Sequence, residues 1–488
     1  MMEETPHSEL LAIRRRKLDA LRELGIDPFG SAFEATEEPG ALRASFAEGK
    51  TVRAAGRVTA HRNMGKSHFF DISDHTGRIQ VYLNSKEAGA EAMQVFDLVD
   101  IGDFVGVEGE TFTTKTGEPS IKASSIRILS KSLRPLPDKW HGLADTEIKY
   151  RQRYLDLVAN RESLDMFHKR IAVVREVRRF LEDRGFIEVE TPMMQAVPGG
   201  AAAQPFKTHH NALGVDLYLR IAPELYLKRL LVGGFTKIFE LNRNFRNEGI
   251  SRRHNPEFTM LEAYWAYADF EKMADLVEEM VCHVAQTVCG TLQIEHKDAE
   301  GKTVRTINLA RPWRRATYRD LIRGIVPDWF ERTPEQRRAW CMENHVDVGH
   351  CTEDFEVTQH VFEKLVEEKT MDPLFVTHCP KELVPLAKQN SADPDLVDVY
   401  ELVINGQEIS PGYSELNDPL VQRTRLEHQS GGETHKLDED FLLALEHGMP
   451  PAGGIGIGID RLAMMLAGAE SIRDVILFPH LRPRAQAH

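Results

Sequence analysis

The chain has 488 residues, of which 42% are hydrophobic and 28% charged, a composition typical of a globular protein with two or three domains. No apolar run approaches the ~18 residues of a membrane-spanning helix, and the N-terminus lacks the apolar stretch of a signal peptide. Five cysteines without a CxxC pair disfavour a zinc knuckle and are typical of a reducing cytoplasm. We therefore expect a cytoplasmic protein.

The net charge of −14 argues against nucleic-acid binding at first sight, because phosphate contacts need Lys and Arg. Charge acts locally, however. Residues 50–130 contain ten Lys and Arg against ten Asp and Glu, so this segment is far less acidic than the rest. An RNA-binding face is allowed there, although the balance alone does not establish one.

Residues 8–24 predict a helix, because their leucines and isoleucines recur at helical spacing before Gly25 and Pro28. We assign residues 1–48 to an N-terminal helical extension. The basic run at 14–17 has two open interpretations, a contact with an RNA backbone or a solvated helix face.

From Val52 to Leu129 the pattern changes to short strands, with a hairpin predicted around Asp74–Gly77. Several strands in ~80 residues indicate a small OB-type barrel at 49–132, whose strand face binds single-stranded nucleic acid. Phe69 has two interpretations. An aromatic residue in a strand is more often core, but Phe70 and Ile72 share one face, which leaves Phe69 on the other, where it can stack on a base.

Residues 133–150, with two prolines, predict a linker. A helix follows, with one face expected to consist of Phe167, Ile171, Val174, Val177 and Leu181. The next strand should lie at an edge or an interface, because Pro192 blocks pairing. Further on, the stretch 221–234 predicts a helix with Pro223 in its first turn and Glu224 beside it. Complementing the helix dipole would alone explain that glutamate.

The stretch 239–262 predicts a hairpin whose polar loop contains Gly249. A solvated hairpin tip is the ordinary interpretation of its scattered charges. Arg246, however, follows Phe245 within the strand-like part, where an unpaired guanidinium is costly to bury. It is expected to bind an anion such as a phosphate or carboxylate. Phe258 on the returning strand can offer its ring to a nucleobase.

Two further stretches indicate a ligand site. Glu401 and Glu408 flank a turn predicted at 405–406, which brings them close, and neighbouring carboxylates repel unless a cation such as Mg²⁺ joins them. Exposed acids on a hairpin are the alternative. At 454–458 glycines alternate with isoleucines and do not form GxGxxG, so one strand face is left bare for a flat ligand. Asp460 is expected to cap the helix that begins near Arg461.

Three ordered stretches carry a resemblance. GFIEVETPMM (185–194), the run from FRNEGIS to HNPEFTMLE (245–262) and GIGIGIDRLAMML (454–466) resemble motifs 1, 2 and 3 of the class II aminoacyl-tRNA synthetases, in the lysine-specific form. The similarity covers nearly the whole chain. It implies an α+β fold: a catalytic domain at 151–488, with an antiparallel sheet flanked by helices and a helical insertion at about 317–395, preceded by an OB-fold anticodon-binding domain. It also implies a homodimer formed through residues 185–194.

The resemblance implies roles for particular residues, each at the position that matches the family pattern. Catalysis falls to Arg246 and Arg461, and Mg²⁺ binding to Glu401 and Glu408. ATP contacts are implied for Arg246, Asn247, Glu248, His254, Asn255, Phe258, Gly458 and Arg461. Lysine contacts are implied for Gly200, Glu224, Glu262, Tyr264, Tyr413 and Glu415. Anticodon contacts are implied for Arg62, Phe69, Gln80 and Glu118.

The reaction implied is activation of L-lysine with ATP to lysyl-adenylate, then transfer to the 3′ end of tRNA(Lys). Two alternative functions remain. The first is a paralogue that has lost catalysis, which the presence of both arginines and all three acids disfavours. The second is a ligase that joins lysine to a protein, but relatives of that kind lack the barrel. A class I synthetase is disfavoured because no HIGH or KMSKS element is present. One departure stands out, since Ser410-Pro411-Gly412 replaces a loop in which the family commonly has asparagine.

Overall fold

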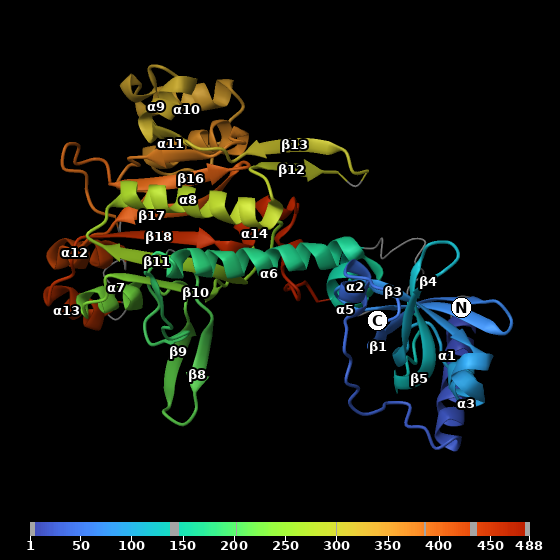
Figure 1. Cartoon of the computed structure of the whole chain (residues 1–488). Coiled ribbons are helices and arrows are strands. Elements are labelled where there is room, and N and C mark those ends of the chain that lie inside the picture. Colours follow the sequence, from blue (N-terminus) through green and yellow to red (C-terminus); the bar gives the residue numbers. More distant parts are fainter. Residues whose placement is uncertain are drawn as a thin grey trace. The chain divides into compact units, whose positions relative to one another are not determined.

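The computed structural model describes residues 5–136, 146–201, 203–298, 300–384, 387–429 and 437–483. The chain divides into two compact units, Met1–Leu164 and Asp165–His488 (Figure 1). Part of the expected linker, residues 137–145, lies outside the described residues. In the described ranges no helix is long and apolar enough to cross a membrane.

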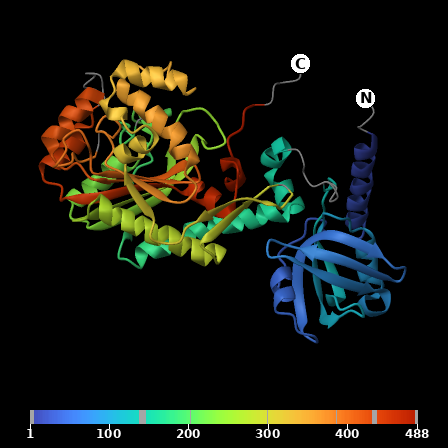
Figure 2. The ribbon, with the colours of Figure 1, turned by 90° about the horizontal axis from the view of Figure 1, so that it is seen from above.

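The first unit is built on a closed barrel in the strand order β1-β2-β3-β5-β4, which Figure 2 shows from above. The barrel forms because apolar residues alternate along its strands, so that Val52, Phe70, Ile72, Val81 and Val107 meet inside. Its strands are β1 (Thr51–Asn63), β2 (Ser67–Ser73), β3 (Arg78–Asn84), β4 (Phe104–Thr113) and β5 (Pro119–Ser130). The helices are α1 (Thr5–Glu23), α2 (Pro39–Ala44), α3 (Ser85–Asp97), α4 (Thr146–Arg151) and α5 (Arg153–Ala159).

The basic run of α1 divides between two environments. Arg14 is buried and donates to the backbone carbonyls of Ile101, Ser132 and Arg134, and Lys17 forms an ion pair with Asp100 at 2.6 Å. Arg15 and Arg16 are exposed. Half of the run therefore fastens the helix to the rest of this unit, and half remains on the surface.

The second unit is organised by an eight-stranded sheet in the order β14-β15-β16-β17-β18-β11-β10-β6. All of its pairs are antiparallel except β14–β15 and β10–β6. Its strands are β6 (Ile187–Glu188), β10 (Lys237–Phe245), β11 (Glu257–Ala266), β14 (Arg314–Thr317), β15 (Leu374–Thr377), β16 (Val399–Ile404), β17 (Gln407–Ser414) and β18 (Ala452–Gly458). Smaller sheets comprise β7 (Met194–Gln195), β8 (Lys207–His210) and β9 (Val215–Leu219), and β12 (Gln293–Lys297) with β13 (Thr303–Asn308).

Helices of this unit pack around the sheet, and α6, α8 and α14 form the main core with it (Figure 1). The helices are α6 (Arg161–Glu182), whose first residues are counted with the first unit, α7 (Glu224–Val232), α8 (Phe270–Cys289), α9 (Tyr318–Ile325), α10 (Pro334–Glu343), α11 (Asp354–Leu365), α12 (Pro419–Gln429), α13 (Glu439–Glu446), α14 (Ile459–Ala467) and α15 (Ile472–Val475). Helix α8 is capped by the Asp269 side chain and ends at Gly290 in the left-handed conformation. Its buried face, including Met273 and Val277, packs on Phe239 and Ile457 of the sheet.

The buried face of α6 differs from the one expected. Phe167, Val177 and Leu181 are buried as predicted, but Ile171 is 57% exposed, and Val173 is buried in its place. The sequence carries two adjacent apolar stripes on this helix, and only one of them meets the core. Val174 is partly buried and packs against the main core, whereas Ile171 lines a shallow groove together with the arginines of the helix.

Three other expectations concern local backbone. The turn at 405–406 is confirmed, with φ of 58° at Asn405 and 68° at Gly406, as a two-residue hairpin turn of type I′ requires. The edge position of the strand after α6 is confirmed, because β6 is the last strand of the sheet. The region 317–395 contains α9 to α11 around a second apolar core, but it also supplies β15 to the main sheet, so it is not purely helical.

Candidate active site

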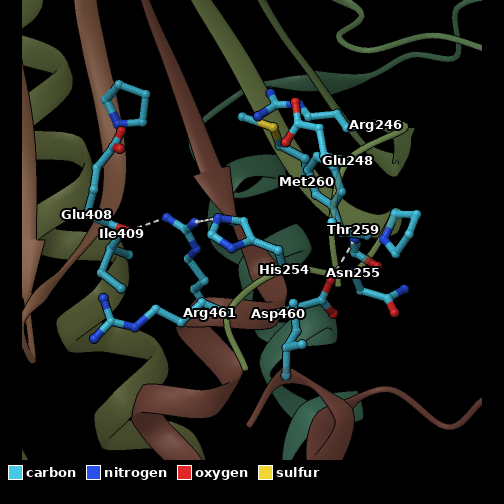
Figure 3. Close-up of a pocket in the computed structure, with 17 residues that line it drawn as sticks. Arg246, Glu248, His254, Asn255, Thr259, Met260, Glu408, Ile409, Asp460 and Arg461 are labelled. Carbon is cyan, nitrogen blue, oxygen red and sulfur yellow. Dashed lines mark hydrogen bonds between the residues drawn. The ribbon is translucent and has the colours of Figure 1, made fainter. Parts of the chain in front are cut away.

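A cavity of about 230 Å³ lies at the ends of β10, β11, β17 and β18 and the start of α14. Its walls include Arg246, Glu248, His254, Glu408 and Arg461, drawn in Figure 3. The paired strands β10 and β11 carry residues 239–245 against 257–263, which confirms the expected hairpin and brings its polar loop to the cavity.

Arg246 directly follows β10, and its guanidinium has no ion pair within the described ranges. The Nε atom is buried and without a hydrogen-bond partner there. Burial lowers the pKa of Arg246, which nevertheless stays a cation because the guanidinium pKa is so high. Its Cζ lies 5.1 Å from the centre of the Phe258 ring. A half-buried cation without an ion pair among the described residues, beside an aromatic face, suits a phosphate attached to a flat base.

Arg461, in the first turn of α14, faces the same cavity from another wall (Figure 3). It donates to the backbone carbonyl of Glu408 at 2.9 Å and lies 3.2 Å from Nε2 of His254. Burial and the neighbouring Arg461 lower the pKa of His254, so the ring is neutral at neutral pH. The bare face of Gly458 lies beside the Arg461 stem, where a Cβ would come within 3.6 Å of Cδ.

The remaining residues with implied ATP roles are less alike. Glu248 lines the cavity and Asn247 is exposed beside it. The buried Asn255 has both amide atoms engaged within the protein, since Nδ2 donates to the carbonyl of Glu257 and Oδ1 accepts from the backbone N–H of His480. Asn255 therefore shapes the loop first, and only the second N–H and the second oxygen lone pair of its amide remain for a ligand.

Asp460 does not cap α14, which corrects the sequence prediction. Its carboxylate accepts from the backbone N–H of Thr259 at 2.7 Å and from Arg170 at 2.7 Å. These partners lie on β11 and α6, so the buried carboxylate joins three elements below the cavity. The prediction of a cap considered only neighbours in sequence, whereas the carboxylate binds partners that are distant in sequence.

Glu401 and Glu408 lie on the paired strands β16 and β17, as expected. Burial and the charge of Glu408 raise the pKa of Glu401 to about 8, and burial raises that of Glu408 as well. A third acid, Glu367, accepts from the Glu408 backbone N–H and has a raised pKa for the same reasons. Within the described ranges none of the three forms an ion pair. Half-buried carboxylates that repel one another and have no ion pair fit a divalent ion such as Mg²⁺.

A second acidic cluster gathers Glu224 from α7, Glu262 and Tyr264 from β11, and Glu415 from the end of β17. All four are buried, and the Tyr264 hydroxyl donates to Glu262 at 3.1 Å. Burial raises the pKa of Glu262 to about 8 and that of Glu415 to about 7. The cluster is therefore built for a ligand that carries positive charge.

Two glycines make room for this cluster. Gly454 lies against Oε1 of Glu415 and the Tyr264 ring, where a Cβ would overlap both. Gly200 has a φ of +86°, and a Cβ there would come within 2.9 Å of the Glu224 Cβ. Tyr413 pairs with Gly454 across β17 and β18. Burial and then the charges of Glu408, Glu224, Glu401 and Glu415 raise the pKa of Tyr413.

The sequence analysis did not identify Lys228. Its Nζ lies 2.7 Å from Glu224 Oε1 and 2.5 Å from Glu415 Oε2, with the side chain 1% exposed. In the sequence it is one more charged residue on an amphipathic helix, four positions after Glu224. That spacing usually marks a solvated pair, so only the fold reveals its place in the cluster.

The predicted anticodon residues lie together on one face of the barrel. Phe69 is half-buried, pairs with Arg62 across the strands and has its ring 5.0 Å from that of Tyr82. Arg62 donates to Gln80 at 2.8 Å, and Gln80 donates to Ser120. Glu118 accepts from Arg43 at 2.6 Å, which lowers the pKa of the carboxyl. Phe70 is buried, so the alternation that sets Phe69 on the outer face holds.

Comparison with known proteins gives two family matches. Residues 145–482 match the model of the class II tRNA synthetases (D, K and N), and residues 52–129 match that of the OB-fold nucleic acid binding domain.

Curated relatives match over nearly their full length. A protein named lysine–tRNA ligase from Carboxydothermus hydrogenoformans is 50% identical, covering 99% of this chain and 100% of that protein. One of the same name from Pelotomaculum thermopropionicum is 49% identical over 98% of this chain and 96% of its own. Another, from Bacillus cereus, is 46% identical with 99% of each covered.

Proposed function

The chain belongs to the class II tRNA synthetases and, within them, to the lysine–tRNA ligase family, and from this premise we propose how its residues divide the reaction. The enzyme activates L-lysine with ATP to lysyl-adenylate and then transfers the lysyl group to the 3′ end of tRNA(Lys) in the cytoplasm. The single observation that carries the substrate choice is the buried cluster of Glu224, Glu262 and Glu415 beside the cavity of Arg246 and Arg461.

ATP binds in the cavity. Its triphosphate meets Arg246, which has no ion pair among the described residues, and its base lies against Phe258, with Arg461 on the opposite side. Asn247, Glu248, His254, Asn255 and Gly458 complete the ATP site, with Asn255 acting through the loop it holds. Glu401 and Glu408 hold Mg²⁺, which supplies charge neutralisation at the phosphate oxygens when bound. Glu367 is close enough to add to their negative field.

Lysine binds in the acidic cluster. Its side-chain ammonium is recognised by Glu415 with Tyr264 and Glu262, which the Tyr264 hydroxyl contacts at 3.1 Å. Glu224 contacts the substrate from the start of α7. Gly200 and Tyr413 close the pocket. An aspartate-specific site would need a cation where these carboxylates stand, so the charge of the cluster selects against acidic amino acids.

The chemistry requires no protein nucleophile. A lysine carboxylate oxygen attacks the α-phosphorus, the bond to the β-phosphate bridging oxygen breaks, and pyrophosphate leaves. A hydroxyl of the terminal adenosine of tRNA then attacks the acyl carbon and AMP departs with the bonding electrons. Arg246 and Arg461 orient the phosphates and stabilise the charge that develops on them. The anticodon is read on the barrel face that carries Arg62, Phe69, Gln80 and Glu118.

The test is amino-acid-dependent exchange of pyrophosphate into ATP, with each of the twenty amino acids. Lysine alone should support strong exchange. Equal activity with aspartate or asparagine would contradict the assignment, because a pocket with three buried carboxylates repels their side chains or leaves its own charges unpaired.

We further propose that the enzyme is a homodimer through the region of residues 185–194. Ile187 and Met194 are 54% and 55% exposed, and β6 is an edge strand, so apolar surface and strand edge both need cover. Light scattering at micromolar concentration should give twice the chain mass of 55.4 kDa. A monomer mass would remove this proposal.

A further inference from the structure

Lys228 is a buried cation inside the pocket assigned to a cationic substrate, and this calls for an explanation. Its ammonium is within hydrogen-bond distance of both Glu224 and Glu415, two of the carboxylates proposed to contact the lysine substrate. A pocket built only to attract an ammonium would gain nothing from a resident one. Lys228 must therefore serve the carboxylates themselves.

The number of charges in the pocket explains why Lys228 is present. Glu224 and Glu415 both touch the same nitrogen, so their oxygens lie close together, and each is buried. Two buried carboxylates at such a distance share a proton unless a cation separates them. With Lys228 between them they carry one net negative charge, which matches the single ammonium of a lysine side chain.

The other groups that face this pair do not take over that task. From β11 come Glu262, with the attached Tyr264 hydroxyl, and from β17 comes Tyr413, none of which supplies a positive charge. From β18 the pocket is lined by Gly454, without a side chain. Arg229, the next residue on α7, turns away and pairs with Asp438 and Asp440.

Building on the proposed function, we propose that Lys228 is a positioning and charge-balancing residue of the lysine pocket: its ammonium holds the Glu224 and Glu415 carboxylates in place and offsets one of their two charges, so that the pair offers one net negative charge to the substrate ammonium. In this role Lys228 does the work that a shared proton would otherwise do. Recognition of lysine then requires less proton exchange at this pair than it would without the ammonium.

The primary test replaces Lys228 with methionine, K228M, which keeps the length and removes the charge. The carboxylate pair should then bind a proton in place of the ammonium, and the incoming substrate should displace part of it. The ratio of the lysine KM of K228M to that of the wild type should fall as pH rises from 6.5 to 8.5, by up to about tenfold per unit. Calorimetry in two buffers of different ionisation enthalpy should show more protons released per lysine bound than in the wild type.

A second measurement needs no substrate. A carboxyl whose pKa is higher in the folded than in the unfolded protein binds more protons when folded, so its contribution to stability is lost as pH rises. The gap in Tm between wild type and K228M should therefore widen from pH 6 to pH 8. Adding E415Q to K228M removes one of the two like charges and should narrow the gap again.

Two further variants separate charge from structure. K228R keeps a cation and should keep the wild-type pH dependence of the lysine KM, even if its larger group raises that KM. R229M breaks an ion pair on the same helix outside the pocket, and it should change Tm without changing the pH dependence.

A pH-independent difference between K228M and wild type, in KM, in proton release and in Tm alike, would overturn the inference and leave Lys228 a structural ion pair. If the wild type shows no lysine-dependent exchange, the proposed function fails instead, while the Tm measurements still decide whether Lys228 balances the pair.

Discussion

The sharpest test of lysine recognition is Glu415→Gln, because the change removes one charge and almost no volume. Glu415 is 2% exposed and its Oε2 lies 2.5 Å from Lys228. The amide cannot balance an ammonium, so one of the two cations in the occupied pocket loses its partner. Removing one member of a buried ion pair costs roughly 3–5 kcal/mol, and kcat/KM for lysine in pyrophosphate exchange should fall about 10²- to 10³·⁵-fold.

Two measurements show that such a loss belongs to recognition. Glu446→Gln, an exposed glutamate at the end of α13, is the matched control and should leave kcat/KM and Tm nearly unchanged. The KM for ATP should change far less than that for lysine, because the nucleotide cavity does not include Glu415. A loss below tenfold in a folded E415Q protein would refute the argument that this carboxylate carries the specificity.

Three other predictions concern separate parts of the molecule. Phe69→Ala should weaken tRNA charging by about 1–3 kcal/mol, the contribution of one base stack, and leave pyrophosphate exchange intact. If charging and exchange both fell and Tm decreased, Phe69 would be a core residue. The lysine KM should fall as pH rises from 6 to 8, since Glu262, with a pKa near 8, must ionise to balance an ammonium; a Glu262→Gln enzyme with the same profile would contradict this. Pro411→Asn should change the lysine or ATP KM less than about tenfold, the worth of one neutral hydrogen bond; an inactive wild type rescued by this change would indicate a paralogue that has lost catalysis.

The sequence predicted those parts of the site that depend on neighbours along the chain. The Asn405-Gly406 turn follows from two residues that tolerate positive φ, and it fixes the strands that carry Glu401 and Glu408. The hairpin of β10 and β11 follows in the same way from its two apolar runs. Phe69 was set on the outer face by simple alternation with Phe70.

Contacts between distant segments could not be predicted in this way. Asp460 had the position of a helix cap, but its partners Thr259 and Arg170 lie hundreds of residues away in sequence. Lys228 had the spacing of a surface ion pair, but it is buried on α7 against Glu415, which directly follows β17. A second apolar stripe on α6, with Ile171, looked like core because periodicity does not tell which of two stripes meets the sheet.

Pro411 is a residue whose surroundings depend both on its neighbours in the chain and on a distant strand. The sequence placed it in a loop, yet it lies in β17, an interior strand of the main sheet, where a residue without an N–H is unfavourable. The register explains why it is tolerated: β17 pairs with β18 only from Gly412 onward, so no ladder bond is missing at Pro411 on that side. The cavity lined by Pro411 and Gly458 lies beyond the last of these pairs. The ladder between the two strands thus ends at the place where the nucleotide is proposed to bind, and a proline, which has no N–H, cannot extend it toward Gly456.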